Sequence, residues 1–209
     1  MKTTILIFIL VSGLQAGAET KYENNFEAAP PGSVPEDFLV LDGSFAVKEE
    51  NGNKFLELPG APLDTFGVLF GPNQKENVEV SARILGTAKG RRYPVFDVGL
   101  NGVGGYKLRV SPAKKQLELY RGDAVKTAVA LEWQPGKWTR LKLQLVKNSE
   151  KEWRINGKVW QEGGTEPAQP TLSFIDHEQP PSGRASVSAM PYSGTPIRFD
   201  DFLVSTTAN

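Results

Sequence analysis

Apolar and polar residues alternate along most of this chain, and this period of two is the feature that most limits its fold. Segment 77–84 reads Asn-Val-Glu-Val-Ser-Ala-Arg-Ile, with every second residue apolar. Side chains of a β-strand point alternately to opposite faces, so this pattern predicts a strand with one buried face. The same pattern recurs in segments 95–100, 106–110 and 116–120. No segment shows the 3.6-residue period of an amphipathic helix.

Short turn signals separate the predicted strands. Asn101-Gly102 and Asn156-Gly157 are typical of two-residue hairpins between antiparallel strands. Segments 28–37 and 161–183 are rich in proline and glycine and are expected to be loops, the second with a short strand at Leu172–Ile175. We therefore predict an all-β fold, an antiparallel two-sheet β-sandwich.

The first eighteen residues have the layout of a secretory signal peptide. Lys2 precedes the apolar run Ile5–Val11, and the small residues Ala16 and Ala18 lie just before Glu19. This run is shorter than the ~20 residues that a membrane-spanning helix needs. We expect cleavage after Ala18, no membrane insertion afterwards, and a secreted or periplasmic protein.

Residues 19–209 are expected to form a single domain, because sandwiches of ~200 residues are often undivided. The chain contains no cysteine, which in an exported protein is more typical of bacteria than of disulfide-rich eukaryotic modules. Its 24 basic and 24 acidic residues balance. A nucleic-acid-binding domain would show a basic excess, so nucleic acid is not an expected partner.

Several segments, in their order along the chain, resemble the concanavalin A-like jelly rolls, a lectin/glucanase superfamily that includes laminin-G-type domains. They are Asp42–Val47 leading to Lys54–Leu58, Gly136-Lys137-Trp138 ahead of Thr139–Lys147, and the closing Arg198–Val204. The resemblance covers the chain after the signal peptide and implies a jelly roll from a bacterial secreted protein. Because this fold hosts hydrolases, lyases, lectins and inert spacers, it does not fix the function.

One face of the predicted central strands carries side chains suited to sugars. If the alternating apolar residues face the core, the opposite face holds the candidate ligand-binding residues Tyr93, Asp97, Arg109, Glu118 and Tyr120, with Arg140 extending it on the next strand. Aromatic rings stack on sugar rings, and charged groups hydrogen-bond their hydroxyls. The alternative is a solvated sheet with cross-strand ion pairs such as Arg109 with Glu118. Trp160 is a second candidate platform, with core packing as its alternative.

The end of the chain carries a possible metal site. Phe199 and Phe202 would fall on opposite faces of a regular strand, so we expect a β-bulge at Asp200-Asp201 that brings one carboxylate close to the core. A buried carboxylate needs hydrogen-bond donors or a cation. In the jelly rolls that the chain resembles, a structural calcium joins the first and last strands, which implies Glu27 with Asp200 or Asp201. The alternative is pairing with backbone groups or arginine, without metal.

Catalytic signatures are absent from the sequence. It lacks the Glu-x-Asp-x-x-Glu strand motif of laminarinase-type glucanases, a Gly-x-Ser-x-Gly elbow, a phosphate-binding glycine loop and a His-Glu-x-x-His motif. The one histidine, His177, lies in a predicted loop and is expected to be idle. Asp97 and Glu118 would suit an acid and base pair only at a separation of about 5–9 Å.

These observations favour an exported, non-catalytic domain that binds a glycan or another extracellular ligand, with an oligo- or polysaccharide as the expected partner. Two alternatives stay open at this point. One is a glycan-active hydrolase of the keto-disaccharide or glucanase type on the same fold. The other is a structural or interaction module with no small ligand.

Overall fold

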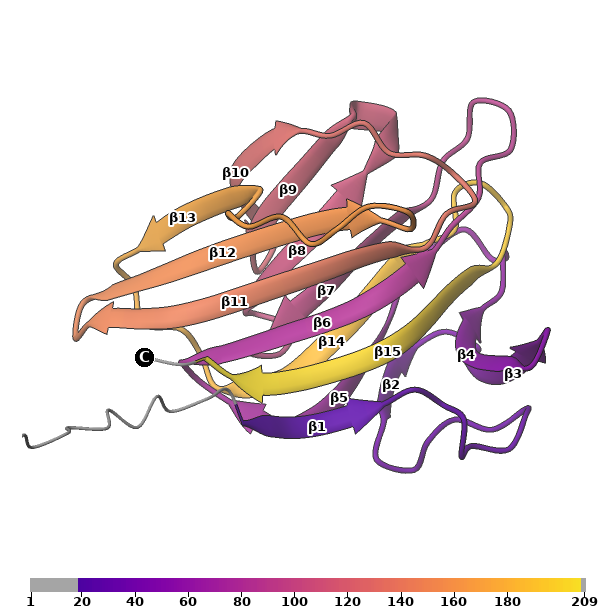
Figure 1. The fold of residues 1–209 in the computed structure, drawn as a ribbon, viewed down its shortest axis with the longest axis horizontal. Helices are drawn as coiled ribbons and strands as arrows, with labels where there is room; N and C mark the ends of the chain where they lie inside the picture. The colour runs from indigo at the N-terminus through magenta and orange to yellow at the C-terminus, as the bar shows by residue number, and fades with distance from the viewer. Residues whose placement is uncertain (1–18, 208–209) are drawn as a thin grey trace, which may run out of the picture.

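The computed structural model describes residues 19–207 as two antiparallel sheets packed face to face (Figure 1). Sheet A contains, in spatial order, β13 (Leu172–Asp176), β12 (Glu152–Gln161), β11 (Thr139–Ser149), β6 (Val78–Leu85), β15 (Ile197–Thr206), β4 (Asn53–Leu58) and β3 (Ala46–Glu50), and β1 (Thr20–Asn24) pairs with β15. Sheet B contains β10 (Ala124–Ala130), β9 (Gln116–Arg121), β8 (Tyr106–Ser111), β7 (Val95–Leu100), β14 (Gly183–Met190), β5 (Phe66–Gln74) and β2 (Leu39–Asp42). The predicted all-β, two-sheet antiparallel sandwich is confirmed.

The core lies between the two sheets, where β6 and β11 face β7 and β8. The alternating apolar residues of the central strands are all completely buried; among them are Val78, Val80, Ala82, Ile84, Phe96, Val98, Leu108, Val110, Leu117, Leu119, Leu141 and Leu143. Strand alternation therefore assigned the inner face of both sheets correctly, because burial of one face fixes the register of a strand.

Segment 28–37 and most of segment 161–183 connect strands as loops, as predicted, and the expected short strand is β13. The expected hairpin turn at Asn156-Gly157 is wrong, because both residues lie inside β12. Pro112–Lys114 form a short 3-10 turn between β8 and β9. In the part of the chain that the structure describes, no helix is long and apolar enough to cross a membrane. The predicted signal peptide, residues 1–18, lies outside the described residues.

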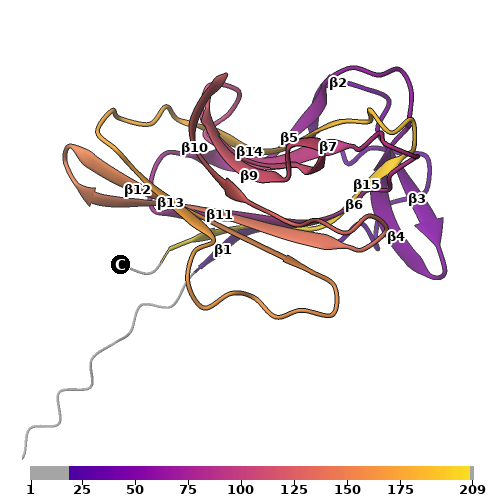
Figure 2. The same ribbon diagram turned by 90° about the horizontal axis from the view of Figure 1, so that it is seen from above.

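Sheet B is curved, and its outer face is concave. Figure 2 shows β10 and β2 rising at opposite ends of the sheet above the central strands β7, β14 and β5. This concave face carries the side chains that alternate with the buried ones on β7, β8 and β9. The curvature brings residues at the sheet ends closer to those at its centre.

The last strand changes partners at a β-bulge. β15 pairs with β4 through Ile197–Phe199 and with β1 through Phe202–Ser205, and its register against β6 shifts between Asp200 and Leu203. Asp201 has a φ of 51°, the left-handed conformation that an extra strand residue adopts. Phe199 and Phe202 are both fully buried as a result, and the expected bulge is confirmed.

Candidate functional site

A row of polar side chains crosses the concave face of sheet B. Ser188 on β14 lies opposite Asp97 on β7, Asp97 lies opposite Arg109 on β8, and Arg109 lies opposite Glu118 on β9. Directly opposed residues in antiparallel strands have neighbouring side chains on the same face. The strand register thus builds a continuous polar row from four strands.

Asp97 is the buried end of this row. Its side chain is 1% exposed, its Oδ2 accepts a hydrogen bond from Arg109 Nε at 2.9 Å, and the same oxygen forms an ion pair with Arg109 Nη2 at 2.9 Å. Its Oδ1 accepts a hydrogen bond from the Ser188 hydroxyl. A buried carboxylate is stabilised only when its oxygens are paired in this way. Asp97 is therefore covered by Arg109 and Ser188, and it orients the Arg109 guanidinium.

Arg109 stands at the centre of the row. Burial disfavours its charged form, but pairing with Asp97 outweighs this effect and raises the pKa of the Arg109 guanidinium. The guanidinium carbon lies over the Tyr120 ring, 4.5 Å from the ring centroid. This cation–π contact fixes the ring of Tyr120 on the concave face.

Glu118 is almost fully buried, with only 3% of its surface exposed. Three hydrogen-bond donors hold its carboxylate. Lys114 Nζ donates to its Oε1 at 2.8 Å, and its Oε2 accepts hydrogen bonds from the Ser111 hydroxyl and, at 3.3 Å, from the Tyr120 hydroxyl. Burial acts to raise the pKa of Glu118, but the hydrogen bonds from Lys114 and Ser111 outweigh it and lower the pKa below its usual value. Glu118 is therefore a stable carboxylate and a poor proton donor.

These side chains surround a hollow of about 290 Å³, which we call the tyrosine hollow after Tyr93, Tyr120 and Tyr192 in its wall. Arg109, Glu118 and Lys114 also line it. Of the six candidate ligand-binding residues from the sequence, four therefore share one hollow: Tyr93, Arg109, Glu118 and Tyr120. An aromatic wall with a few oriented charged groups is the composition that sugar recognition requires.

Arg140 does not belong to this site. β11 pairs with β6 and β12 in sheet A, so Arg140 lies on the other sheet, where its Nη2 pairs with Asp201 Oδ2 at 2.6 Å. The expectation that Arg140 extends the concave face is corrected. Alternation gives the face of a strand but not the sheet to which the strand belongs.

Tyr192 and Lys114 are among the residues of the tyrosine hollow that sequence reasoning missed. Tyr192 lies in the loop after β14, and Lys114 lies in the 3-10 turn after β8. Neither is part of an alternating segment, so strand periodicity gave no signal for them. The only local signal was the spacing of Lys114 and Glu118, which form an ion pair four residues apart.

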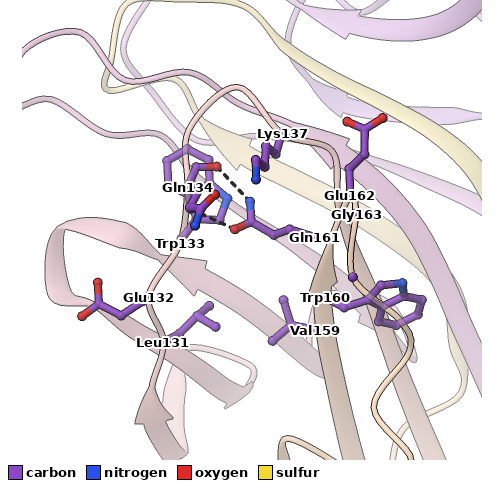
Figure 3. Close-up of a pocket in the computed structure, with 11 residues that line it drawn as sticks. Leu131, Glu132, Trp133, Gln134, Lys137, Val159, Trp160, Gln161, Glu162 and Gly163 are labelled. Carbon is purple, nitrogen blue, oxygen red and sulfur yellow. Dashed lines mark hydrogen bonds between the residues drawn. The ribbon is translucent and has the colours of Figure 1, made fainter.

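A second hollow, of about 410 Å³, lies near the end of β12 (Figure 3). Gln161 holds its wall together: its Nε2 donates to the Gln134 carbonyl at 2.8 Å, and its Oε1 accepts the Gln134 N–H at 2.9 Å. The Trp133 indole donates to Thr139 Oγ1 at 2.9 Å. These polar groups fasten the 131–138 loop to the sheet. Trp160 is half-buried at the side of this hollow.

The expected calcium ligands have hydrogen-bond or ion-pair partners within the chain. Asp200, 1% exposed, accepts from Arg83 Nη2 at 2.5 Å and from Asn53 Nδ2 at 3.0 Å, and Asp201 Oδ2 lies 3.2 Å from Arg83 Nε. Glu27 Oε1 accepts the Lys54 N–H at 3.0 Å. Across residues 19–207, no group of three or more acidic, histidine or cysteine side chains is placed to hold a metal. The arginine contacts of Asp200 and Asp201 agree with the arginine-paired alternative, and the calcium stays a prediction.

His177 is exposed, with its Nδ1 3.2 Å from the Lys151 carbonyl oxygen. The neighbouring Asp176 is directed elsewhere: its Oδ2 accepts from the buried Tyr106 hydroxyl at 2.8 Å and from Arg121 Nη1 at 2.8 Å. That pairing links β8 of sheet B to β13 of sheet A, so Asp176 has a structural role.

Comparison with known proteins gives a fold and not a close relative. No family model matches the chain, and no curated protein matches it. Among solved structures, a Bacillus subtilis protein of unknown function with a galectin-like fold superimposes with a TM-score of 0.61 at 13% identity, covering 90% of this chain and 97% of that one.

Two further matches differ in activity. The carbohydrate-binding module CBM66 of Bacillus subtilis superimposes with a TM-score of 0.55 at 10% identity, covering 81% of this chain and 96% of its own. The catalytic domain of a family 131 glycoside hydrolase from Coprinopsis cinerea gives 0.57 at 9% identity, with coverage of 91% and 98%. The fold is therefore that of the concanavalin A-like jelly rolls, as the sequence resemblance implied.

Proposed function

We propose that this protein is an exported glycan-binding domain whose ligand site is the tyrosine hollow on the concave face of sheet B. The single observation that carries the proposal is the arrangement of Tyr120, whose ring is fixed by Arg109 in the wall of that hollow. A ring that is already in place loses little entropy when a sugar stacks on it, so its contact energy contributes to affinity. The fold shared with a carbohydrate-binding module supports the same function.

Binding without chemistry fits the carboxylates of the site. Glycoside hydrolysis requires a carboxylic acid whose pKa is raised so that it can protonate the leaving group. The pKa of Glu118 is lowered instead, through its hydrogen bonds from Lys114 and Ser111. Asp97 is covered by Arg109 and Ser188. Neither group is arranged to donate a proton to a sugar.

The direct test is a glycan array with the purified 19–209 protein, followed by titration calorimetry on the glycans that bind. The expected result is binding that Tyr120→Ala weakens and Trp160→Ala leaves unchanged, because Trp160 lines the hollow near β12 and not the tyrosine hollow. The opposite pattern would move the site to Trp160. Release of reducing sugar from a bound glycan would establish a hydrolase, and an array without any binder would favour a structural module.

A further inference from the structure

The concave face carries another hollow, which is apolar and lies directly beside the tyrosine hollow. It has a volume of about 160 Å³ and its wall includes Leu41, Leu69 and Val103, which define what we call the apolar hollow. Arg109 lines both hollows. A molecule that reaches across Arg109 would therefore contact tyrosine rings at one end and aliphatic side chains at the other.

Two of the three aliphatic residues that define this hollow are exposed. Leu41 is 49% exposed on β2, the edge strand of sheet B, and Val103 is 60% exposed in the loop between β7 and β8. Leu39, 51% exposed, lies opposite Leu69 in the β2–β5 pairing and so extends the same surface. Exposed aliphatic side chains that cluster around a concavity mark a binding surface more often than single ones do.

Small residues form part of the lining of the apolar hollow. Gly67, Ser186 and Ser188 line it, and they come from the neighbouring strands β5 and β14. A Cβ atom at Gly67 would lie 3.3 Å from the Ser188 Cβ, closer than comfortable packing allows. The absence of larger side chains leaves room between the aliphatic wall and Arg109.

We propose that the ligand is a glycoside with an apolar aglycone, whose sugar occupies the tyrosine hollow and whose hydrocarbon or aromatic group occupies the apolar hollow. This inference rests on the proposed glycan-binding function and names the class of glycan. The apolar hollow has about the volume of the ~150 Å³ cavity that accommodates one benzene ring, so it suits a small apolar group better than a protein segment. The two hollows adjoin at Arg109. A single ligand with a sugar at one end and an apolar group at the other would therefore fill both.

The test compares methyl and hexyl glycosides of glucose, galactose and arabinose by protein-observed NMR titration, below micelle-forming concentrations. For a sugar that binds, the hexyl glycoside should bind at least about tenfold more tightly than the methyl glycoside, the gain expected when two further methylenes are buried. Leu41→Ser should remove most of this gain and leave the affinity for the methyl glycoside unchanged. Val103→Ser serves as the second variant if Leu41→Ser folds poorly.

Leu63→Ser is the matched control, because Leu63 is 51% exposed but does not line the apolar hollow. Equal affinities for methyl and hexyl glycosides, or a hexyl gain that survives both variants, would overturn the proposal. If 1-hexanol alone binds the apolar hollow as tightly as the hexyl glycosides bind, whatever their sugar, the hollow is a hydrocarbon site and the proposal is overturned. Methyl glycosides that bind without a hexyl gain would refute this inference while leaving the proposed glycan-binding function intact.

Discussion

The guanidinium of Arg109 lies over the ring of Tyr120, 4.5 Å from its centroid. The same guanidinium is bound to the buried carboxylate of Asp97 at 2.9 Å. The ring that we assign to sugar stacking is therefore positioned by an ion pair located beneath the concave face. Changes in the pair should therefore act on both stability and binding, whereas changes in the ring should act mainly on binding.

Replacing Tyr120 should reduce affinity without unfolding the domain. Tyr120→Ala removes a half-buried ring that faces away from the core, and aromatic contacts contribute roughly 0.5–1.5 kcal/mol beyond area burial. We expect binding to weaken several-fold or more in calorimetry, with only a small fall in melting temperature from the lost contacts with Arg109 and Glu118. Tyr120→Phe keeps the ring and should bind nearly as well as the wild type. Equal losses in both variants would assign the effect to the hydroxyl.

Replacing Arg109 should destabilise the fold. Arg109→Ala leaves Asp97 buried without its cationic partner, and removal of one partner of a buried ion pair costs about 3–5 kcal/mol. Urea denaturation measures this loss. The double variant Asp97→Ala/Arg109→Ala should be less unstable than the sum of the two single variants, because no unpaired charge remains. Additive losses would mean that the two residues do not stabilise each other.

The unfolding free energy of the domain should fall in acid, in part because Glu118 becomes protonated. The pKa of Glu118 is lower in the folded state than the ~4.3 of an unfolded glutamate, so its pairing stabilises the fold above about pH 4.3. This contribution disappears as the pH falls through the lower pKa of the folded state. Glu118→Gln should therefore flatten the fall in unfolding free energy below that pH. An unchanged pH profile in the variant would remove Glu118 as its source.

The calcium site at Glu27, Asp200 and Asp201 stays a prediction from resemblance, and thermal unfolding can decide between it and arginine pairing. Burial raises the pKa of Asp200, and its hydrogen bonds from Asn53 and Arg83 only partly oppose this. We expect Arg83→Met to lower the melting temperature clearly and a chelator to leave it unchanged. A ligand that binds only the folded state stabilises it by mass action, so a lower melting temperature in chelator would establish the metal.

Export can be tested independently of ligand binding. N-terminal sequencing of the protein from its host's periplasm or medium should begin at Glu19, because Ala16 and Ala18 are the small residues that signal cleavage requires. A product that still begins at Met1 would contradict the predicted location.

Alternation along the chain was enough to tell which side chains of the central strands face the core and which face outward. Alternation placed Arg109, Glu118 and Tyr120 on one face and predicted the bulge at Asp200, because a period of two specifies the orientation of every side chain along a strand. These properties depend only on neighbours along the chain. They needed no knowledge of which strands pair.

Tertiary structure alone decided which strands and loops meet at the site. β11 joins sheet A and takes Arg140 away from the concave face, whereas Tyr192 and Lys114 reach the tyrosine hollow from a loop and a turn. The apolar hollow likewise unites Leu41 with Val103, which are far apart in the sequence. Pairing between distant strands is selected by the fit of the whole core, and no local period encodes that fit.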